Sequence, residues 1–156
     1  MKIYVIRHAH AVPEGPALAD EHRYLSVRGR EVARAVAVAL RDRGVLLDAF
    51  YTSPLVRAVQ TAELMAEALG YTGEVRTLPA LAPGVPPRVV AERASQLGNA
   101  LALVGHEPGI SALGAELVGR PSFPQFRPGQ VCAIESGTPL WSFNPESLAF
   151  EQLLVA

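Results

Sequence analysis

Residues 2–8 of the chain read KIYVIRH, and this stretch decides the fold. Its apolar part is short and rich in β-branched and aromatic residues, which is typical of a buried strand. The apolar run ends at Arg7 and His8. We therefore expect a first strand inside the protein, whose carboxyl end carries an arginine and a histidine.

Further along the chain, short apolar runs alternate with segments of helical periodicity. We expect strands at about residues 48–52, 75–78 and 100–104, and two or three more after residue 130. We expect helices at about residues 26–43, 54–69, 88–96 and 108–118. Strands that alternate with helices form a mostly parallel sheet with helices on both faces. The sequence thus predicts a three-layer αβα sandwich, built as a single domain over residues 1–156.

The ends of two predicted helices carry recognisable capping residues. Ser26 is placed to cap the first helix, and Gly44 is placed to end it. Ser53 and Pro54 predict the start of the second helix, with the serine as N-cap and the proline at the first helical position. Gly70 stands where a C-terminal cap of that helix would lie.

The composition argues against several classes of function. The chain has 156 residues, a formal net charge of −1 and no run of basic residues, so nothing points to a nucleic acid partner. Cys132 is the only cysteine, which excludes an internal disulfide and a thiolate metal cluster. The apolar stretch near the N-terminus is too short for a signal peptide or a membrane span, and Arg7 interrupts it. We therefore expect a cytoplasmic protein without a membrane partner.

Residues suited to phosphate chemistry stand at the ends of three predicted elements. Arg7 precedes His8, and a neighbouring cation keeps a histidine neutral, which is the state that a nucleophile needs. Arg57 lies in the first turn of the second predicted helix, where the helix dipole and the guanidinium both favour an anion. His106 follows the strand that ends near residue 104. In a parallel sheet these positions share one edge, where ligands bind.

Each of these residues also has an ordinary structural interpretation. A histidine after a strand is often incidental, Arg57 fits a solvated surface arginine, and His106 fits a residue that bonds the backbone at a helix start. Their convergence on one sheet edge carries more weight than any one of them.

Three motifs, in this order, resemble the histidine phosphatase superfamily, which is also called phosphoglycerate-mutase-like. They are RHA at residues 7–9, SPLVRAVQTA at residues 53–62 and VGHEPG at residues 104–109. The short chain and the RHA form of the first motif are similar to the small bacterial branch of SixA-like phosphohistidine phosphatases. The resemblance extends along nearly the whole chain.

The resemblance implies a role for each motif residue. His8 would attack phosphorus and form a covalent phosphohistidine, while Arg7, Arg57 and His106 would bind the phosphoryl oxygens. Water would then release phosphate, without a metal ion or another cofactor. No group of carboxylates in the sequence is spaced to hold a metal.

The general acid is the least defined part of the predicted site. Larger members of the superfamily place an acidic residue near the leaving group, on an inserted segment that this short chain lacks. Glu107 is the candidate here, with Asp20 and Glu21 as alternatives, although each also fits a solvated loop carboxylate. A good leaving group, such as the imidazole of phosphohistidine, needs less from an acid. Arg23, in the loop before the first helix, is a candidate for reaching an extended substrate.

The sequence leaves the substrate open. The leading hypothesis is a phosphatase that acts on the phosphohistidine of a phosphorylated protein, with a histidine phosphotransfer domain as the candidate partner. A phosphatase for a small phosphorylated metabolite or nucleotide would share the same phosphate pocket, and a non-catalytic phosphate-binding protein is the alternative of another class. Short loops at residues 13–25 and 119–129 would favour a protein substrate, and covering loops would favour a small molecule.

Overall fold

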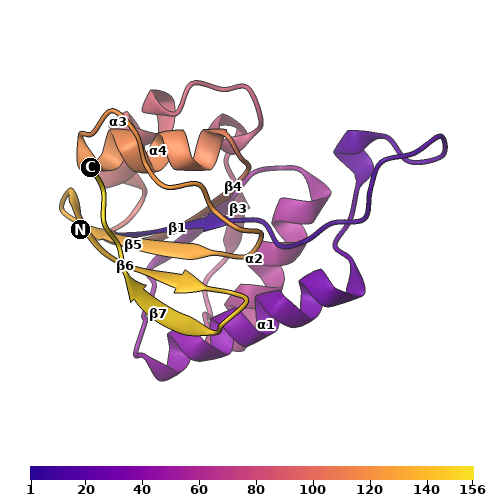
Figure 1. The fold of residues 1–156 in the computed structure, drawn as a ribbon, viewed down its shortest axis with the longest axis horizontal. Coiled ribbons are helices and arrows are strands. Elements are labelled where there is room, and N and C mark those ends of the chain that lie inside the picture. The colour runs from indigo at the N-terminus through magenta and orange to yellow at the C-terminus, as the bar shows by residue number, and fades with distance from the viewer.

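The computed structural model describes residues 1–156 and is built around one seven-stranded sheet, seen in Figure 1. The strand order across the sheet is β3-β2-β4-β1-β5-β6-β7. The strands are β1 (Lys2–Arg7), β2 (Ala49–Thr52), β3 (Val75–Thr77), β4 (Ala100–Gly105), β5 (Val131–Glu135), β6 (Thr138–Asn144) and β7 (Ala149–Gln152). Every strand expected from the sequence is present, and the C-terminal segment forms three.

The sheet has a parallel half and an antiparallel half. Strands β1, β4, β2 and β3 pair in parallel, and β5, β6 and β7 extend the sheet by antiparallel pairing. The prediction of parallel pairing therefore holds for the strands that helices connect, and the C-terminal hairpins make the sheet a mixed one. The parallel half brings the carboxyl ends of β1, β2 and β4 to the same edge, with Arg7 in register with Gly105.

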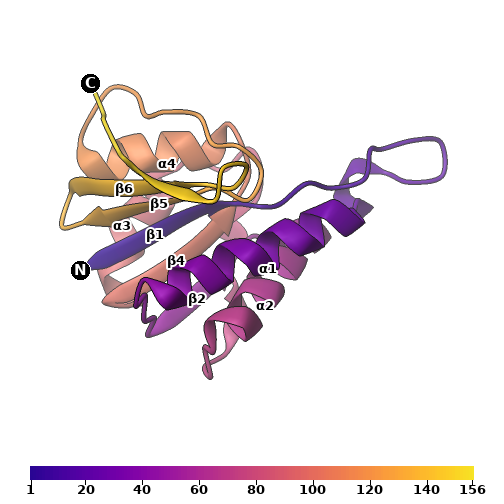
Figure 2. The same ribbon diagram turned by 60° about the horizontal axis from the view of Figure 1, so that its bottom comes forward.

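Four helices cover the two faces of the sheet, as Figures 1 and 2 show. One face carries α1 (Val27–Asp42) and α2 (Val56–Leu69), and the other carries α3 (Arg88–Leu97) and α4 (Gly109–Val118). The predicted three-layer αβα sandwich is confirmed. In none of these helices is there an apolar stretch long enough to cross a membrane.

Strand β1 contributes to both hydrophobic cores, as the alternation of side chains along a strand requires. Tyr4 and Ile6 pack into the core beneath α1 and α2, whereas Ile3 and Val5 pack into the core beneath α3 and α4. Because β1 is fixed by apolar contacts on both faces, its carboxyl end has a defined position, and this end carries the first candidate site residues.

Two of the predicted helix caps are confirmed. The Ser26 side chain accepts a hydrogen bond from the backbone N–H of Gly29, at 3.0 Å, and so caps α1. Gly70 follows α2 with φ of 75°, the left-handed conformation that ends a helix. Gly29 has a second role, because a side chain there would overlap the carbonyl oxygen of His10. The start of α1 can therefore approach the segment that follows β1.

The predicted cap at Ser53 is wrong. Helix α2 begins two residues later than expected, its N-cap is Leu55, and no side chain caps it. The hydroxyl of Ser53 accepts from the N–H of Leu55, at 3.2 Å, and also contacts His106. Ser53 therefore lies in the turn between β2 and α2, where its hydroxyl joins two loops at the edge of the sheet.

The segment between β1 and α1 extends away from the body of the protein, as the indigo ribbon in Figure 1 shows. It contains one short 3-10 turn, η1 (Asp20–His22), and it returns to the body through an antiparallel bridge between Ala11 and Leu25. Gln60 of α2 anchors the return, because its side-chain oxygen accepts from the N–H of Leu25 at 2.8 Å. The loop thus projects at the edge of the sheet where the candidate site residues lie.

Candidate active site

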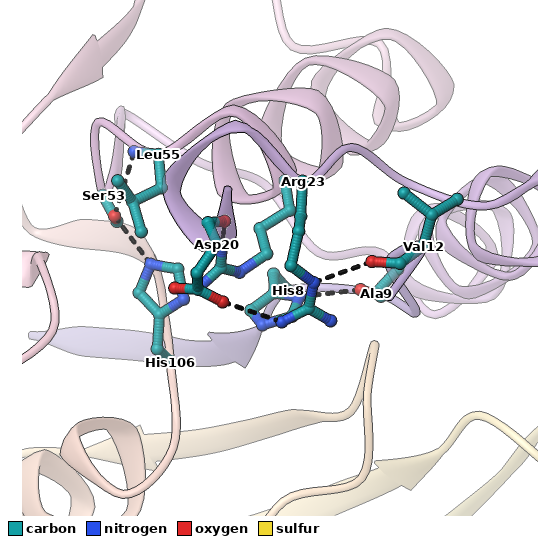
Figure 3. Close-up of polar contacts among 9 residues, drawn as sticks. His8, Ala9, Val12, Asp20, Arg23, Ser53, Leu55 and His106 are labelled. Atoms are coloured by element: carbon teal, nitrogen blue, oxygen red, sulfur yellow. Dashed lines mark hydrogen bonds and ion pairs between the residues drawn. The ribbon is translucent and has the colours of Figure 1, made fainter. Parts of the chain in front are cut away.

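Three segments of the chain bring the candidate residues together at the carboxyl edge of the parallel strands. Arg7 and His8 stand at the end of β1, Arg57 lies in the first turn of α2, and His106 follows β4. The ring centroids of His8 and His106 are 5.0 Å apart. Both histidines and Arg57 are buried, with exposed fractions of 8%, 6% and 5%. The structure therefore gathers all four residues, and Figure 3 shows the two histidines at the centre of the site.

The tautomer of His8 follows from a single hydrogen bond. Its Nδ1 lies 2.7 Å from the carbonyl oxygen of Ala9. A carbonyl can only accept, so Nδ1 carries the hydrogen and donates it. In the neutral ring, the lone pair is then on Nε2, which is the nucleophilic atom of this tautomer.

Thr61 of α2 fixes the backbone next to His8. Its hydroxyl oxygen accepts from the N–H of Ala9, at 3.0 Å, and its own hydrogen goes to the carbonyl of Arg57, at 2.8 Å. Thr61 is fully buried, so these bonds form away from water. One side chain thus couples the segment that carries the histidine to the helix turn that carries the arginine.

Burial, together with the positive charges of Arg57, Arg7 and Arg23, lowers the pKa of His8 to about 4, against the opposing effect of the hydrogen bond to Ala9. His8 is therefore neutral at physiological pH. A neutral imidazole is the nucleophilic form, so the surroundings hold this residue in the state that the sequence predicted from its arginine neighbour.

His106 is held by Ser53 from the neighbouring strand end. Its Nε2 lies 2.7 Å from the serine hydroxyl. That hydroxyl accepts from the N–H of Leu55, and its own hydrogen can go to Nε2, an arrangement that puts the hydrogen of the neutral ring on Nδ1. Burial lowers the pKa of His106 to about 3, and the nearby His8 and arginine charges act in the same direction. His106 is therefore a neutral ring with a donor on Nδ1.

Three buried side-chain nitrogens have no hydrogen-bond partner, and all three belong to this site. They are Nε of Arg7, Nε of Arg57 and Nδ1 of His106. Buried donors are almost always paired in folded proteins, because an unpaired one carries the full cost of losing water. Donors from two guanidinium groups and an imidazole suit the oxygens of a phosphoryl group.

The two carboxylates nearest the site are both engaged by donors. The oxygens of Glu107 accept from the backbone N–H groups of Ser111 and Phe126, each at 2.9 Å. Asp20 lies 3.0 Å from Arg23 and 3.3 Å from Arg57, and hydrogen bonding to Arg23 lowers the pKa of its carboxyl. For Asp20, these contacts favour the ionised carboxylate over a proton donor. Glu21, the third candidate acid, is exposed on η1.

Two further polar residues lie near the site. His10 is exposed, and its Nδ1 lies 2.7 Å from the hydroxyl of Ser26. Arg23 donates to Asp20 at 3.0 Å and so lies at the same site as Arg57, and a contact of Arg23 with substrate stays a prediction. No group of three or more histidine, cysteine, aspartate or glutamate side chains is arranged to hold a metal ion.

Sequence reasoning missed the residues that support the site. Ser53 was assigned to a helix cap, although it directly follows β2 and therefore stands at the same edge as His106. Thr61 lies within the second motif but four residues past Arg57, one helical turn further on, and a threonine there can bond the carbonyl one turn back. The position of Ser53 after β2 and the spacing of Thr61 from Arg57 were the sequence signals that could have indicated these supporting roles.

Comparison with known proteins identifies the family of this chain. Residues 3–82 match the model of the histidine phosphatase superfamily, branch 1. A protein of unknown character from Picosynechococcus is 33% identical over 118 residues, which cover 70% of this chain and 68% of that protein. The chain therefore belongs to the histidine phosphatase superfamily. The family expected from the three motifs is confirmed.

Within the superfamily, the similarity to SixA covers nearly the whole length of both proteins. The phosphohistidine phosphatase SixA of Escherichia coli is 26% identical over 157 residues, covering 95% of this chain and 96% of that protein. The structure of SixA complexed with tungstate has a TM-score of 0.88 to this one, at 25% identity, over 96% of this chain and all of that one. SixA is a phosphatase of this superfamily, and the predicted enzyme class and the phosphoglycerate-mutase-like fold are confirmed.

Proposed function

We propose that this protein is a phosphohistidine phosphatase, which removes the phosphoryl group from a histidine of another protein through a covalent intermediate on His8. The observation that carries the proposal is the neutral His8 ring, whose Nε2 is unprotonated. The centroid of this ring lies 5.0 Å from that of His106, and the ring lies near two arginines. The likeness to SixA along nearly the whole chain supports the same substrate class. We propose that residues 1–156 act as one domain.

In the first step, Nε2 of His8 forms a bond to phosphorus while the bond from phosphorus to the substrate nitrogen breaks. The electron pair of the broken bond stays on the leaving imidazole, and Nδ1 of His8 keeps its hydrogen bond to Ala9. Arg7, Arg57 and His106 donate to the phosphoryl oxygens, where charge is concentrated in the transition state. Their positions are fixed before substrate arrives, so little reorganisation accompanies the reaction.

In the second step, a water oxygen bonds to phosphorus and the bond from phosphorus to Nε2 breaks. The electron pair returns to the ring, and the protons of the water pass to phosphate and solvent. His8 is regenerated in its neutral form, because burial and three nearby guanidinium charges hold its pKa at about 4. The same donors serve both steps, since both have a similar phosphoryl group in transit.

The engaged carboxylates point to a substrate with a good leaving group. Both oxygens of Glu107 accept from backbone N–H groups, and the Asp20 carboxylate is bound by two arginines, so the site offers no free carboxyl group to give a proton to a leaving oxygen. An alkyl phosphate needs such a proton, because an alkoxide leaves poorly. The imidazole of phosphohistidine leaves as a neutral ring once its other nitrogen is protonated. A phosphorylated protein, such as a histidine phosphotransfer domain, is therefore the proposed partner, and the cytoplasm is the proposed location.

One observation favours a second candidate, a phosphatase for a small molecule. A cavity of about 320 Å³ is lined by His106 and by apolar residues of the segment after β3 and of α4, among them Leu81, Val85 and Ile110. An apolar cavity that borders a catalytic residue suits the non-phosphoryl part of a small metabolite or nucleotide. The two candidates differ in whether the best substrate is a protein.

The test is a phosphate-release assay in the presence of EDTA. We expect the wild-type protein to act on a histidine-phosphorylated phosphotransfer domain and on p-nitrophenyl phosphate, and to act poorly on alkyl phosphates. A panel of nucleotide and metabolite monophosphates is run alongside. A kcat/KM for any of these above that for the phosphoprotein would replace the proposal by the small-molecule function. Phosphate binding with no turnover of any substrate would indicate a binding protein instead.

A further inference from the structure

The carboxylate of Asp20 bridges two arginines at the mouth of the site. One oxygen lies 3.0 Å from Nη1 of Arg23, and the other lies 3.3 Å from Nη2 of Arg57. Arg57 is almost fully buried, with 6% of its side chain exposed, whereas 48% of the Asp20 side chain is exposed. The bridge therefore links a fixed guanidinium to a carboxylate that is free to turn toward solvent.

Arg23 is also held by a backbone carbonyl, although through Nε, whereas Arg7 and Arg57 use Nη1. Its Nε donates to the carbonyl of Val12, at 2.7 Å, and its Nη1 donates to Asp20, while its Nη2 has no partner. Its side chain is 25% exposed. Figure 3 shows the Arg23 guanidinium beside His8, and its charge is among those that lower the pKa of that histidine. An arginine fixed near the nucleophile, with a donor unused, is placed to bind an anion.

We propose that Arg23 is a third phosphoryl-binding arginine of this site, and that the Asp20 carboxylate occupies the position of a phosphoryl oxygen between Arg23 and Arg57 until substrate displaces it. This inference rests on the proposed function, because it assumes that the phosphoryl group binds at His8. It assigns opposite effects to two residues in contact: Arg23 strengthens anion binding and Asp20 weakens it.

The chemistry of the three groups supports this exchange. A carboxylate and a phosphoryl group are both oxygen anions that guanidinium groups bind with two donors. The phosphoryl group has three oxygens and more charge, so it can take the donors of Arg23 and Arg57 together with those of Arg7 and His106. The Asp20 side chain loses little by leaving Arg23, because an ion pair between two solvent-accessible side chains contributes little to stability.

Tungstate affinity measured by calorimetry tests the proposal, since this oxyanion binds without being turned over. For Arg23→Ala we expect tungstate to bind at least about tenfold more weakly than to the wild type, as for loss of a charge-assisted hydrogen bond. For Asp20→Asn we expect severalfold tighter binding, because the competing charge is gone while the backbone carbonyl of residue 20 still holds Arg57. Arg28→Ala, at an exposed arginine in the first turn of α1 with no ion pair, is the matched control and should bind like the wild type.

Two results would overturn the proposal: weaker binding by Asp20→Asn, which would make Asp20 a support for the arginines, or unchanged binding by Arg23→Ala. A gain of affinity cannot come from misfolding, so Asp20→Asn keeps the test decisive even where Arg23→Ala is unstable. Arg23→Lys should recover only part of the affinity, because lysine lacks the fork of donors. If the wild type binds tungstate but releases no phosphate from phosphohistidine, the proposed function fails while the roles of Arg23 and Asp20 are still measured.

Discussion

Arg7 and Arg57 are held in the site by the same kind of contact, a hydrogen bond from Nη1 to a backbone carbonyl of a loop. Nη1 of Arg7 donates to the carbonyl of Phe126 at 2.8 Å, and Nη1 of Arg57 donates to the carbonyl of Asp20 at 2.7 Å. Each arginine keeps a buried Nε without a partner. The two loops outside the sheet, before α1 and after α4, therefore each fix one guanidinium through the backbone, and both leave one buried donor unpaired.

These backbone contacts fix the positions of the two guanidinium groups without neutralising their positive charges. A carbonyl satisfies part of the guanidinium without neutralising it, so the positive charges remain available to lower the pKa of His8 and to bind an anion. The site thus combines a neutral nucleophile with cationic surroundings, which is the combination that phosphoryl transfer to a histidine requires.

Replacing Ser53 should lower the rate of the chemical step. Ser53→Ala removes the hydroxyl that orients His106 and fixes its tautomer, so we expect kcat with p-nitrophenyl phosphate to fall by about tenfold, the effect of losing one well-placed hydrogen bond. Steady-state kinetics measure the change. Ser95→Ala, at an exposed position of α3, is the control, and an Ser53→Ala enzyme as active as that control would show that His106 needs no such support.

Replacing Thr61 should affect both stability and activity. Thr61→Val keeps the shape but leaves the N–H of Ala9 buried without an acceptor, which costs about 1–3 kcal/mol of unfolding free energy. The backbone beside His8 also loses its link to α2, so kcat should fall. Urea unfolding and steady-state kinetics test this together. Thr77→Val, at an exposed position of β3, should change neither, and unchanged stability in Thr61→Val would contradict the assigned bonds.

Glu107 is predicted to matter for stability and not for proton transfer. In Glu107→Gln, an amide NH₂ replaces one oxygen that accepts from a backbone N–H, so we expect a loss of about 1–3 kcal/mol in unfolding free energy. The ratio of kcat values for aryl and alkyl phosphates should stay as in the wild type. A selective loss of alkyl phosphate turnover would instead establish Glu107 as the general acid.

The buried histidines make the stability depend on pH in acid. Burial holds the pKa of His8 at about 4, below its ordinary value of 6.5, so the unfolded chain binds a proton in this window that the folded protein does not. The unfolding free energy should therefore fall as pH drops from about 6.5 toward 4, by about 1.4 kcal/mol per pH unit for this residue. Chemical denaturation at several pH values measures it, with His8→Gln as the comparison. Equal slopes for the two proteins would mean that His8 titrates normally.

The positions of the main candidate residues could be predicted from the sequence, because they follow from the pattern of apolar and polar side chains. The apolar run of β1 and the polar residues directly after it placed Arg7 and His8 at a sheet edge, and the same logic placed His106 after β4. Ser53 was misassigned, since a serine before a proline reads as a helix cap, and only the three-dimensional proximity of two loops shows that its hydroxyl meets His106.

The contacts that support the arginines could not be predicted from side-chain patterns. The acceptors for Arg7 and Arg57 are backbone carbonyls, which every residue has, so no residue type at positions 126 or 20 announces them. The bridge from Asp20 to Arg23 and Arg57 likewise depends on the path of the loop before α1.

The most direct test of the account is to locate the phosphoryl group during turnover. A histidine-phosphorylated phosphotransfer domain is mixed with the enzyme in EDTA, the reaction is quenched at alkaline pH where phosphohistidine survives, and the peptides are analysed by mass spectrometry. The account predicts a phosphoryl group on His8 in the wild type and in His10→Ala, with neither adduct nor phosphate release in His8→Ala. Phosphate release by His8→Ala at the wild-type rate, or an adduct on another residue, would contradict it.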